Sequence, residues 1–188
     1  MPRPTPKNNE IKLDPGRYIV SRTDPKGIIT FGNVYFCAIC GYSVEELLGQ
    51  PHNIIRHPDM PKIAFKLMWD TIQKGRDFVA VVKNMAKDGS YYWVMTEFIP
   101  KKDPATGEIV EYTAYRKAPP RAAIDIVEPL YKKLCAAEEQ GGMEASEALL
   151  NEYLKKQGET YESWVVRITG KSNPITALFF KAMRKLFG

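Results

Sequence analysis

The chain has 188 residues, 44% of them apolar and 11% aromatic, which is enough to bury one core and a smaller accessory region. Its formal net charge is +5, and residues 1–166 balance at zero, so the excess lies near the C-terminus: Arg167, Lys171, Lys181, Arg184 and Lys185. A charge confined to one end excludes the broad basic surface of a nucleic-acid-binding protein. No apolar run approaches the ~18–20 residues that span a bilayer.

The three cysteines are an odd number, and no apolar signal segment follows the start "MPRPTPKNNE". Both features favour a reducing, cytoplasmic setting. Cys37 and Cys40 form a single C-x-x-C, and both histidines lie well past it. We therefore interpret them as small apolar positions on a short helix and predict no metal site.

The first elements follow from local signals. Residues 1–14 are rich in proline and polar groups and predict a flexible arm. "RYIVSRT" and "IITFG" predict two strands joined by the turn "DPKG". Asn33 is a candidate N-cap for a short helix ended by Gly41. Ser43 and Glu46 have the spacing of a capping box, which predicts a second short helix ended by Gly49.

The stretch "PHNIIRHPDMP", residues 51–61, holds both histidines of the chain, His52 and His57. Pro58 and Pro61 exclude a regular helix, because they remove amide donors and restrict the residues before them. The stretch is too polar for a core strand. We expect an irregular binding loop, since free backbone amides and charged side chains can both face a ligand there.

The next elements complete a sheet. "KIAFKLMWDTIQKG" predicts an amphipathic helix ended by Gly75. "FVAVVKNMAK" and "SYYWVMTEFIP" predict a hairpin turned at Asp88-Gly89, and "IVEYTAYRK" a further strand. The fold class predicted is α+β: a five-stranded antiparallel sheet with short helices over one face, which leaves a pocket between the two.

From Pro119 the apolar spacing becomes helical, which predicts a helical extension over residues 119–188. We expect a kink or restart at Pro129, a break at Gly141-Gly142, and an end at Gly158. "SWVVRI" has no clear type. Residues 175–187 predict an amphipathic helix with a basic back, which either packs on its own protein or docks on a membrane or a receptor.

The run "GYSVEELLGQPHNIIRHPDMPKIAFKLMWDTIQKG" followed by "VKNMAKDGSYYWV" resembles the PAS domain of bacterial aerotaxis and energy-taxis receptors (the Aer type). The resemblance extends from Tyr18 to Arg116 and implies a PAS sensor domain over residues 15–118. It implies FAD held noncovalently between helices and sheet, and redox sensing rather than catalysis. The chain is more similar to the soluble PAS partner of split energy-taxis systems (CetB-like). In those systems a separate membrane-bound chemoreceptor, with a HAMP segment, carries the signalling part.

The resemblance also implies the flavin-binding positions. They are Arg56, His57, Asp59, Asn33, Asn53, Trp69, Tyr92, Trp93, Tyr112, Arg116 and Phe78, which stands where the family often has tryptophan. Arg56 can fork onto a phosphate or clamp a ring edge, and His57 can donate to a flavin oxygen. The alternatives are that Arg56 and Asp59 form a surface ion pair, that His57 caps a loop, and that Trp69 and Trp93 are core residues.

Three functions remain open. The first is a flavin-binding PAS sensor of redox or energy state that signals to a membrane chemoreceptor in aerotaxis or energy taxis. The second is a PAS sensor with haem b, in which His57 or His52 is the axial ligand. The third is a cofactor-free interaction module. An enzyme is disfavoured, because no Gly-rich phosphate loop or nucleophile–base pair is present. A homodimer is open, and so is contact of residues 172–188 with the inner face of the cell membrane.

Overall fold

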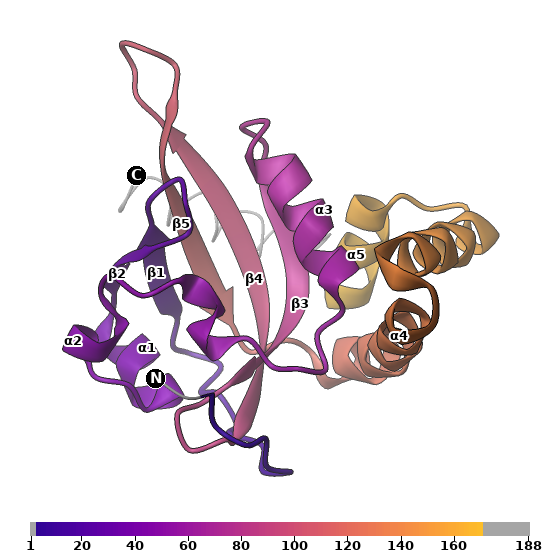
Figure 1. Cartoon of the computed structure of the whole chain (residues 1–188), viewed down its shortest axis with the longest axis horizontal. Helices are drawn as coiled ribbons and strands as arrows, with labels where there is room; N and C mark the ends of the chain where they lie inside the picture. Colours follow the sequence, from indigo (N-terminus) through magenta and orange to yellow (C-terminus); the bar gives the residue numbers. More distant parts are fainter. Residues whose placement is uncertain (1–2, 171–188) are drawn as a thin grey trace.

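Residues 3–170 are described in the computed structural model. Five antiparallel strands form one sheet in the spatial order β2–β1–β5–β4–β3 (Figure 1). This arrangement confirms the predicted sheet and its two hairpins. The strands are β1 (Ile19–Thr23), β2 (Ile29–Gly32), β3 (Phe78–Met85), β4 (Tyr91–Lys102) and β5 (Ile109–Lys117).

Short helices between β2 and β3 cover one face of the sheet, as predicted (Figure 1). The Asn33 side chain accepts from the Phe36 amide, and Ser43 and Glu46 form a complete capping box. These local bonds fix where the first two helices begin. The helical elements are α1 (Val34–Cys40), α2 (Val44–Leu47), the 3₁₀ turn η1 (His52–Ile55) and α3 (Lys62–Ile72).

The extension after the sheet is helical, as predicted: α4 (Arg121–Gln157) and α5 (Tyr161–Thr169). α4 is broken at Gly141 and Gly142, and its two halves fold back on each other (Figure 1). Of the kink or restart expected at Pro129, the restart is wrong, since the helical dihedrals continue through this residue. Pro129 and Asp125 are both exposed, so the carbonyl that loses its partner lies on the solvent side. The untyped "SWVVRI" belongs to α5.

The N-terminal residues differ from the flexible arm that the sequence predicts. The Lys7 amide donates to the Gly89 carbonyl at 2.8 Å, and the Ile11 amide to the Tyr91 carbonyl at 2.7 Å. Ile11 and Leu13 also pack against the core, which supplies the apolar anchor that the prediction overlooked. The arm passes so close to the β3–β4 turn that a Cβ on Gly89 would lie 2.1 Å from the Thr5 carbonyl oxygen. Glycine is therefore required there.

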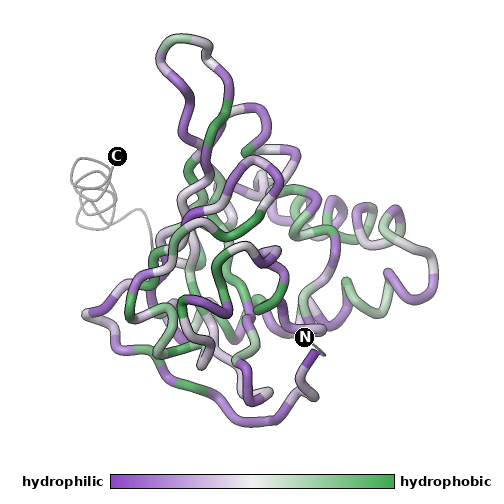
Figure 2. Tube along the Cα trace, turned by 60° about the vertical axis from the view of Figure 1, so that its left-hand side comes forward, coloured by the Kyte–Doolittle hydropathy of each residue, from purple (hydrophilic) through white to green (hydrophobic). Residues whose placement is uncertain are grey.

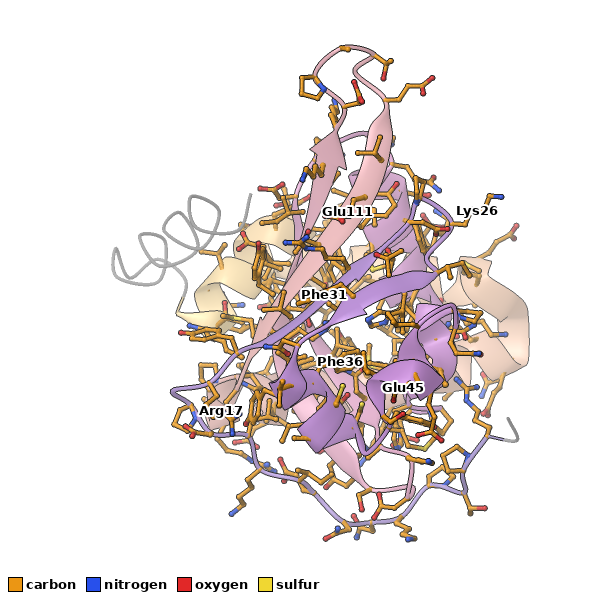
Figure 3. All side chains as sticks on the ribbon, turned by 90° about the vertical axis from the view of Figure 1, so that its left-hand side faces the viewer. Arg17, Lys26, Phe31, Phe36, Glu45 and Glu111 are labelled. Atoms are coloured by element: carbon orange, nitrogen blue, oxygen red, sulfur yellow. The ribbon has the colours of Figure 1, made fainter. Side chains whose placement is uncertain are left out.

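The hydrophobic stretches of the chain run through the central strands and the inner sides of the helices (Figure 2). Figure 3 faces the β1–β2 edge and shows Phe36 on α1 and Lys26 on the β1–β2 turn. Within residues 3–170, no helix is both long and apolar enough to cross a membrane. The helix predicted for residues 175–187, and the contacts proposed for residues 172–188, lie outside the described part of the chain.

Candidate functional site

A cavity of about 230 Å³ lies between the inner face of the sheet and the helices, where the sequence predicts a pocket. α3 supplies one wall through Phe65, Met68, Trp69 and Ile72, which share a helix face because they recur at i, i+3, i+4 and i+7. η1 and the residue after it supply His52, Asn53, Ile55 and Arg56. The sheet supplies the floor, and Lys26 and Asn53 are exposed at the mouth.

The floor carries a buried cation. Arg116 on β5 is 2% exposed, and its guanidinium donates to Ser21 Oγ and to His52 Nε2, both at 2.9 Å. No ion pair joins Arg116 to a carboxylate within residues 3–170. Burial lowers its pKa to about 10, so the guanidinium stays charged at neutral pH. A buried charge of this kind is costly unless an anionic or electron-rich group faces it.

The histidine beside Arg116 is neutral. Because arginine can only donate, His52 Nε2 must be the acceptor, and Ser21 Oγ, at 3.0 Å, donates to the same nitrogen. Burial first, and then the Arg116 charge, lower the pKa of His52 to about 3. The ring also stacks on Phe36, with centroids 6.0 Å apart and planes 7° apart. His52 therefore holds Arg116 in place without adding a second charge.

A hydroxyl without a partner lies beside this cluster. Thr96 on β4 is directly opposite Arg116 in the β4–β5 ladder, lines the cavity and is 0% exposed. No group in the described part of the chain forms a hydrogen bond with Thr96 Oγ1. A buried hydroxyl left unmatched costs about 1–3 kcal/mol. Thr96 therefore adds a buried polar group to the cavity floor beside Arg116.

The cavity combines this polar floor with aromatic walls and cationic edges. Trp69 and Tyr112 meet edge to face, with ring centroids 5.6 Å apart. The Arg56 guanidinium carbon lies 3.9 Å from the centroid of the Phe65 ring. Lys26, Arg56 and Arg116 are cationic, and none of the lining residues that the structure describes is acidic. The site suits a flat ring with apolar faces and an electron-rich polar edge, on a ligand whose anionic part extends through the mouth.

Five of the eleven residues implied as ligand contacts line this cavity: Asn53, Arg56, Trp69, Tyr112 and Arg116. The other six do not. Asn33 is instead occupied as the N-cap of α1. Phe78 stacks on Tyr161 of α5, with centroids 5.2 Å apart and planes 3° apart. These two side chains therefore hold the fold together around the site.

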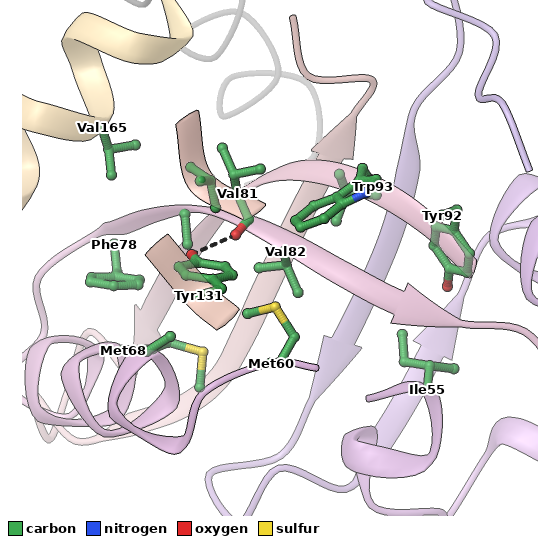
Figure 4. Packing of buried hydrophobic residues seen from close by; sticks show 14 of the residues in the cluster. Ile55, Met60, Met68, Phe78, Val81, Val82, Tyr92, Trp93, Tyr131 and Val165 are labelled. Atoms are coloured by element: carbon green, nitrogen blue, oxygen red, sulfur yellow. Dashed lines mark hydrogen bonds between the residues drawn. The ribbon is translucent and has the colours of Figure 1, made fainter. Parts of the chain in front are cut away.

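The remaining four lie elsewhere for distinct reasons. The Asp59 carboxylate forms an ion pair with Lys83 Nζ at 2.6 Å. His57 Nδ1 accepts from the Asp59 amide at 3.1 Å, which makes it the loop cap considered above. Tyr92 and Trp93 are successive residues of β4 and point to opposite faces of the sheet, with Tyr92 near Ile55 (Figure 4). Both are buried core residues.

The implied flavin contacts omit several lining residues, above all Ser21, Asn84 and Thr96, and His52 was considered only as a haem ligand. His52 carried a signal, because it belongs to the 51–61 stretch. No local sequence signal marked Ser21, Asn84 or Thr96, because the register of the strands decides which strand residues face Arg116. Among the described residues no three His, Cys, Asp or Glu side chains gather as a metal site would require.

Comparison with known proteins gives one family match and several similar sequences. Residues 29–115 match the PAS fold family. The chain is 44% identical to the aerotaxis receptor of Escherichia coli over 118 residues, which are 63% of this chain and 23% of that protein. It is 31% identical to the nitrogen fixation regulatory protein of Klebsiella pneumoniae over 98 residues, 52% of this chain and 20% of that protein. The chain thus spans about a quarter or less of these relatives.

Solved structures agree on the fold. The light-state structure of the blue-light photoreceptor Aureochrome1 LOV has a TM-score of 0.51 and 24% identity, covering 65% of this chain and 91% of that one. A light-oxygen-voltage domain studied with a flavin analogue has a TM-score of 0.51 and 23% identity, covering 60% and 84%. Together with the five-stranded sheet, the helices over one face and the cavity between them, these matches show that residues 29–115 have the PAS fold.

Proposed function

We propose that the chain is a flavin-binding PAS sensor of redox state that signals to a membrane chemoreceptor in energy taxis. The observation that carries this proposal is the cavity floor, where the buried cation of Arg116 and the buried Thr96 both line a cavity with aromatic walls and no acidic residue among the described lining residues. Similarity to an aerotaxis receptor and to a nitrogen fixation regulator supports a sensor rather than an enzyme.

A flavin fits the residues present. Its ring has apolar faces for Trp69, Phe65 and the aliphatic side chains of α3, and a carbonyl-rich edge for Arg116 and Thr96. The cavity of about 230 Å³ is smaller than the roughly 300–1,000 Å³ of typical ligand pockets, so the ring would fill it. The phosphates of FAD would then extend through the mouth, past the cations of Arg56 and Lys26.

When bound, a flavin supplies a ring that takes up electrons and protons reversibly. The chain's own groups set the surroundings for that change. Arg116 places a fixed positive charge at the floor, which favours added negative charge in the cavity. His52, with its pKa lowered to about 3, remains a neutral acceptor for Arg116 throughout the physiological range. The α3 side chains exclude water from the ring faces.

Haem is less well supported by the geometry. His52 Nε2 is already used by Ser21 and Arg116, and the arginine cation at 2.9 Å opposes a metal cation at the same nitrogen. His57, the other candidate ligand, does not line the cavity. A cofactor-free module is less well supported, because in such a module side chains would be expected to fill the space, and a cavity of about 230 Å³ is present.

The test is the visible spectrum of the purified protein after dialysis, followed by titration of the flavin-free protein with FAD. We expect the two bands of an oxidised flavin. Arg116→Gln should bind FAD roughly 10- to 150-fold more weakly, because a hydrogen bond from a charged group contributes about 1.5–3 kcal/mol. Arg121→Gln is the matched control, since Arg121 is exposed and pairs with Glu10 at the surface.

Two results would overturn the proposal: absence of flavin bands even after FAD is added, or undiminished FAD affinity in Arg116→Gln. A single intense Soret band would instead identify haem. Signalling is tested separately, by cosedimentation of the protein with membranes that contain the receptor. We expect the bound fraction to differ between oxidised and reduced protein.

A further inference from the structure

The N-terminus of α3 has no cap of its own. Pro61 precedes the helix and makes no capping bond, and the first turn contains no acidic residue. The carboxylate of Glu138, on α4, occupies this place instead. Its Oε2 accepts from the Lys62 amide and its Oε1 from the Ile63 amide, both at 2.9 Å. A carboxylate at a helix N-terminus also complements the helix dipole, so α3 is stabilised by a residue 75 positions away.

The same carboxylate holds the two halves of α4 together. Ser146, in the second half, is 0% exposed, and its hydroxyl hydrogen is shared between two acceptors, the Met143 carbonyl at 2.9 Å and Glu138 Oε1 at 3.2 Å. The break between the halves includes Gly142, whose φ of +71° favours glycine. Glu138 is therefore a point at which α3, the first half of α4 and the second half of α4 meet, and the ion pair of Lys66 with Glu147 at 3.4 Å is a second, more exposed link between α3 and the second half.

Glu138 ends a stripe of contacts along one face of α4. Tyr131 Oη donates to the Val81 carbonyl on β3 at 2.8 Å (Figure 4). Cys135 Sγ donates to the Asp59 carbonyl, in the 51–61 loop, at 3.3 Å. Tyr131, Cys135 and Glu138 lie four and three residues apart, which places them on one helix face. α4 thus touches in turn the strand, the loop and the helix that enclose the cavity.

α3 lies between the cavity and α4. One of its faces carries Phe65, Met68, Trp69 and Ile72 into the cavity, while its N-terminal amides are held by Glu138. A helix moves nearly as a rigid body, because its backbone hydrogen bonds are internal. A ligand change that shifts Trp69 or Phe65 must therefore alter the geometry at Glu138.

We propose that Glu138 couples the cavity to α4: a change at the cavity moves α3, and the Glu138 carboxylate passes that change to the second half of α4 through Ser146. The inference rests on the proposed function for the nature of the change, a change in flavin redox state. By this proposal the helical extension, as well as the sheet, transmits the change at the cavity to a partner.

The test is hydrogen exchange in oxidised and reduced protein, for wild type, Glu138→Gln and the control Glu139→Gln. Glutamine is isosteric but turns an N–H₂ donor toward one of the two α3 amides. We expect Glu138→Gln to bind flavin and to exchange roughly fivefold faster at residues 62–66 and 143–157, as the loss of a helix cap typically allows. The redox difference at residues 143–157, present in wild type, should vanish in this variant, while the difference at α3 remains. Glu139, which is exposed, should behave like wild type when replaced.

Two outcomes overturn the coupling. One is a redox difference at residues 143–157 that survives in Glu138→Gln. The other is a wild-type protein in which α3 responds to reduction and residues 143–157 do not. If the protein binds no flavin, the proposed function fails, but the coupling is still decided by Trp69→Leu, which changes the cavity wall directly. Trp69→Leu should alter hydrogen exchange at residues 143–157 in an otherwise wild-type chain but not in the Glu138→Gln variant. If Trp69→Leu changes exchange there equally in both chains, the coupling through Glu138 is refuted.

Discussion

The two histidines allow a quantitative test of the fold through the pH dependence of its free energy of unfolding. The chain contains only His52 and His57, so they dominate side-chain titration between pH 5 and 7. Burial and the Arg116 charge lower the pKa of His52 from 6.5 to about 3. Burial and the Lys83 charge lower the pKa of His57 from 6.5 to about 4, although Asp59 acts in the opposite direction.

The direction in which stability changes with pH depends on whether the folded or the unfolded state binds more protons. As the pH falls below 6.5, both histidines become protonated in the unfolded chain but remain neutral in the folded one. The stability that the neutral rings contribute is therefore complete above pH 6.5 and is lost as the pH falls toward 4 and then 3. Each histidine costs about 1.4 kcal/mol per pH unit in that window, so the free energy of unfolding should fall by about 2–4 kcal/mol between pH 7 and 5.

Urea unfolding at pH 7, 6 and 5 measures this loss. His57→Gln should remove about half of the pH dependence, since each ring contributes similarly. An NMR titration of the folded protein gives a check that needs no variant, because neither ring should titrate above pH 5. A free energy of unfolding that is constant from pH 7 to 5, or a ring that titrates near 6.5 in the folded protein, would refute the reasoning.

Three further predictions concern the cavity and its surroundings. Thr96→Val should lower FAD affinity by roughly 2- to 13-fold, because the loss of a neutral hydrogen bond costs about 0.5–1.5 kcal/mol. The melting temperature of the flavin-free variant should not fall. Unchanged FAD affinity would show that no ligand atom bonds to the hydroxyl. Tyr131→Phe should lower the free energy of unfolding by about 0.5–1.5 kcal/mol, measured in urea, because the Val81 carbonyl loses its donor; a neutral effect would mean that water replaces it. Hydrogen exchange should differ between oxidised and reduced protein in strands 78–84, 91–99 and 110–116, and identical exchange would exclude signalling through the sheet.

Local signals predicted most of the fold. The Asn33 cap, the Ser43–Glu46 box and the Asp88-Gly89 turn each depend on residues within a few positions, so their bonds could be anticipated from spacing alone. The arm over residues 3–14 was different, because its partners on the β3–β4 turn and at the start of β4 lie about 80 residues away. Pro129 shows the opposite error, in which a strong local rule is overridden by exposure to solvent.

The site was only half predictable, and strand geometry explains why. Tyr92 and Trp93 cannot both face one cavity, because successive strand residues point to opposite faces, and alternation alone could have excluded one of them. Thr96 and Ser21 could not be predicted from local sequence. They lie beside Arg116 because β4 and β1 pair with β5, and no local pattern determines that pairing. Asp59 was assigned to a ligand, but its partner Lys83 is on β3, 24 residues away.

The cavity floor departs from the usual rule that buried charged and polar groups are paired. Arg116 is buried without a carboxylate among the described residues, and the Thr96 hydroxyl has no partner there, so both groups destabilise the ligand-free protein. Apolar residues of similar size would often stabilise such a position. Departures of this kind are expected at functional sites, where the interactions missing from the free protein are completed by a ligand. The same two groups that weaken the free protein thus give the ligand its orientation, and a ligand that satisfies them must raise the stability of the fold as it binds.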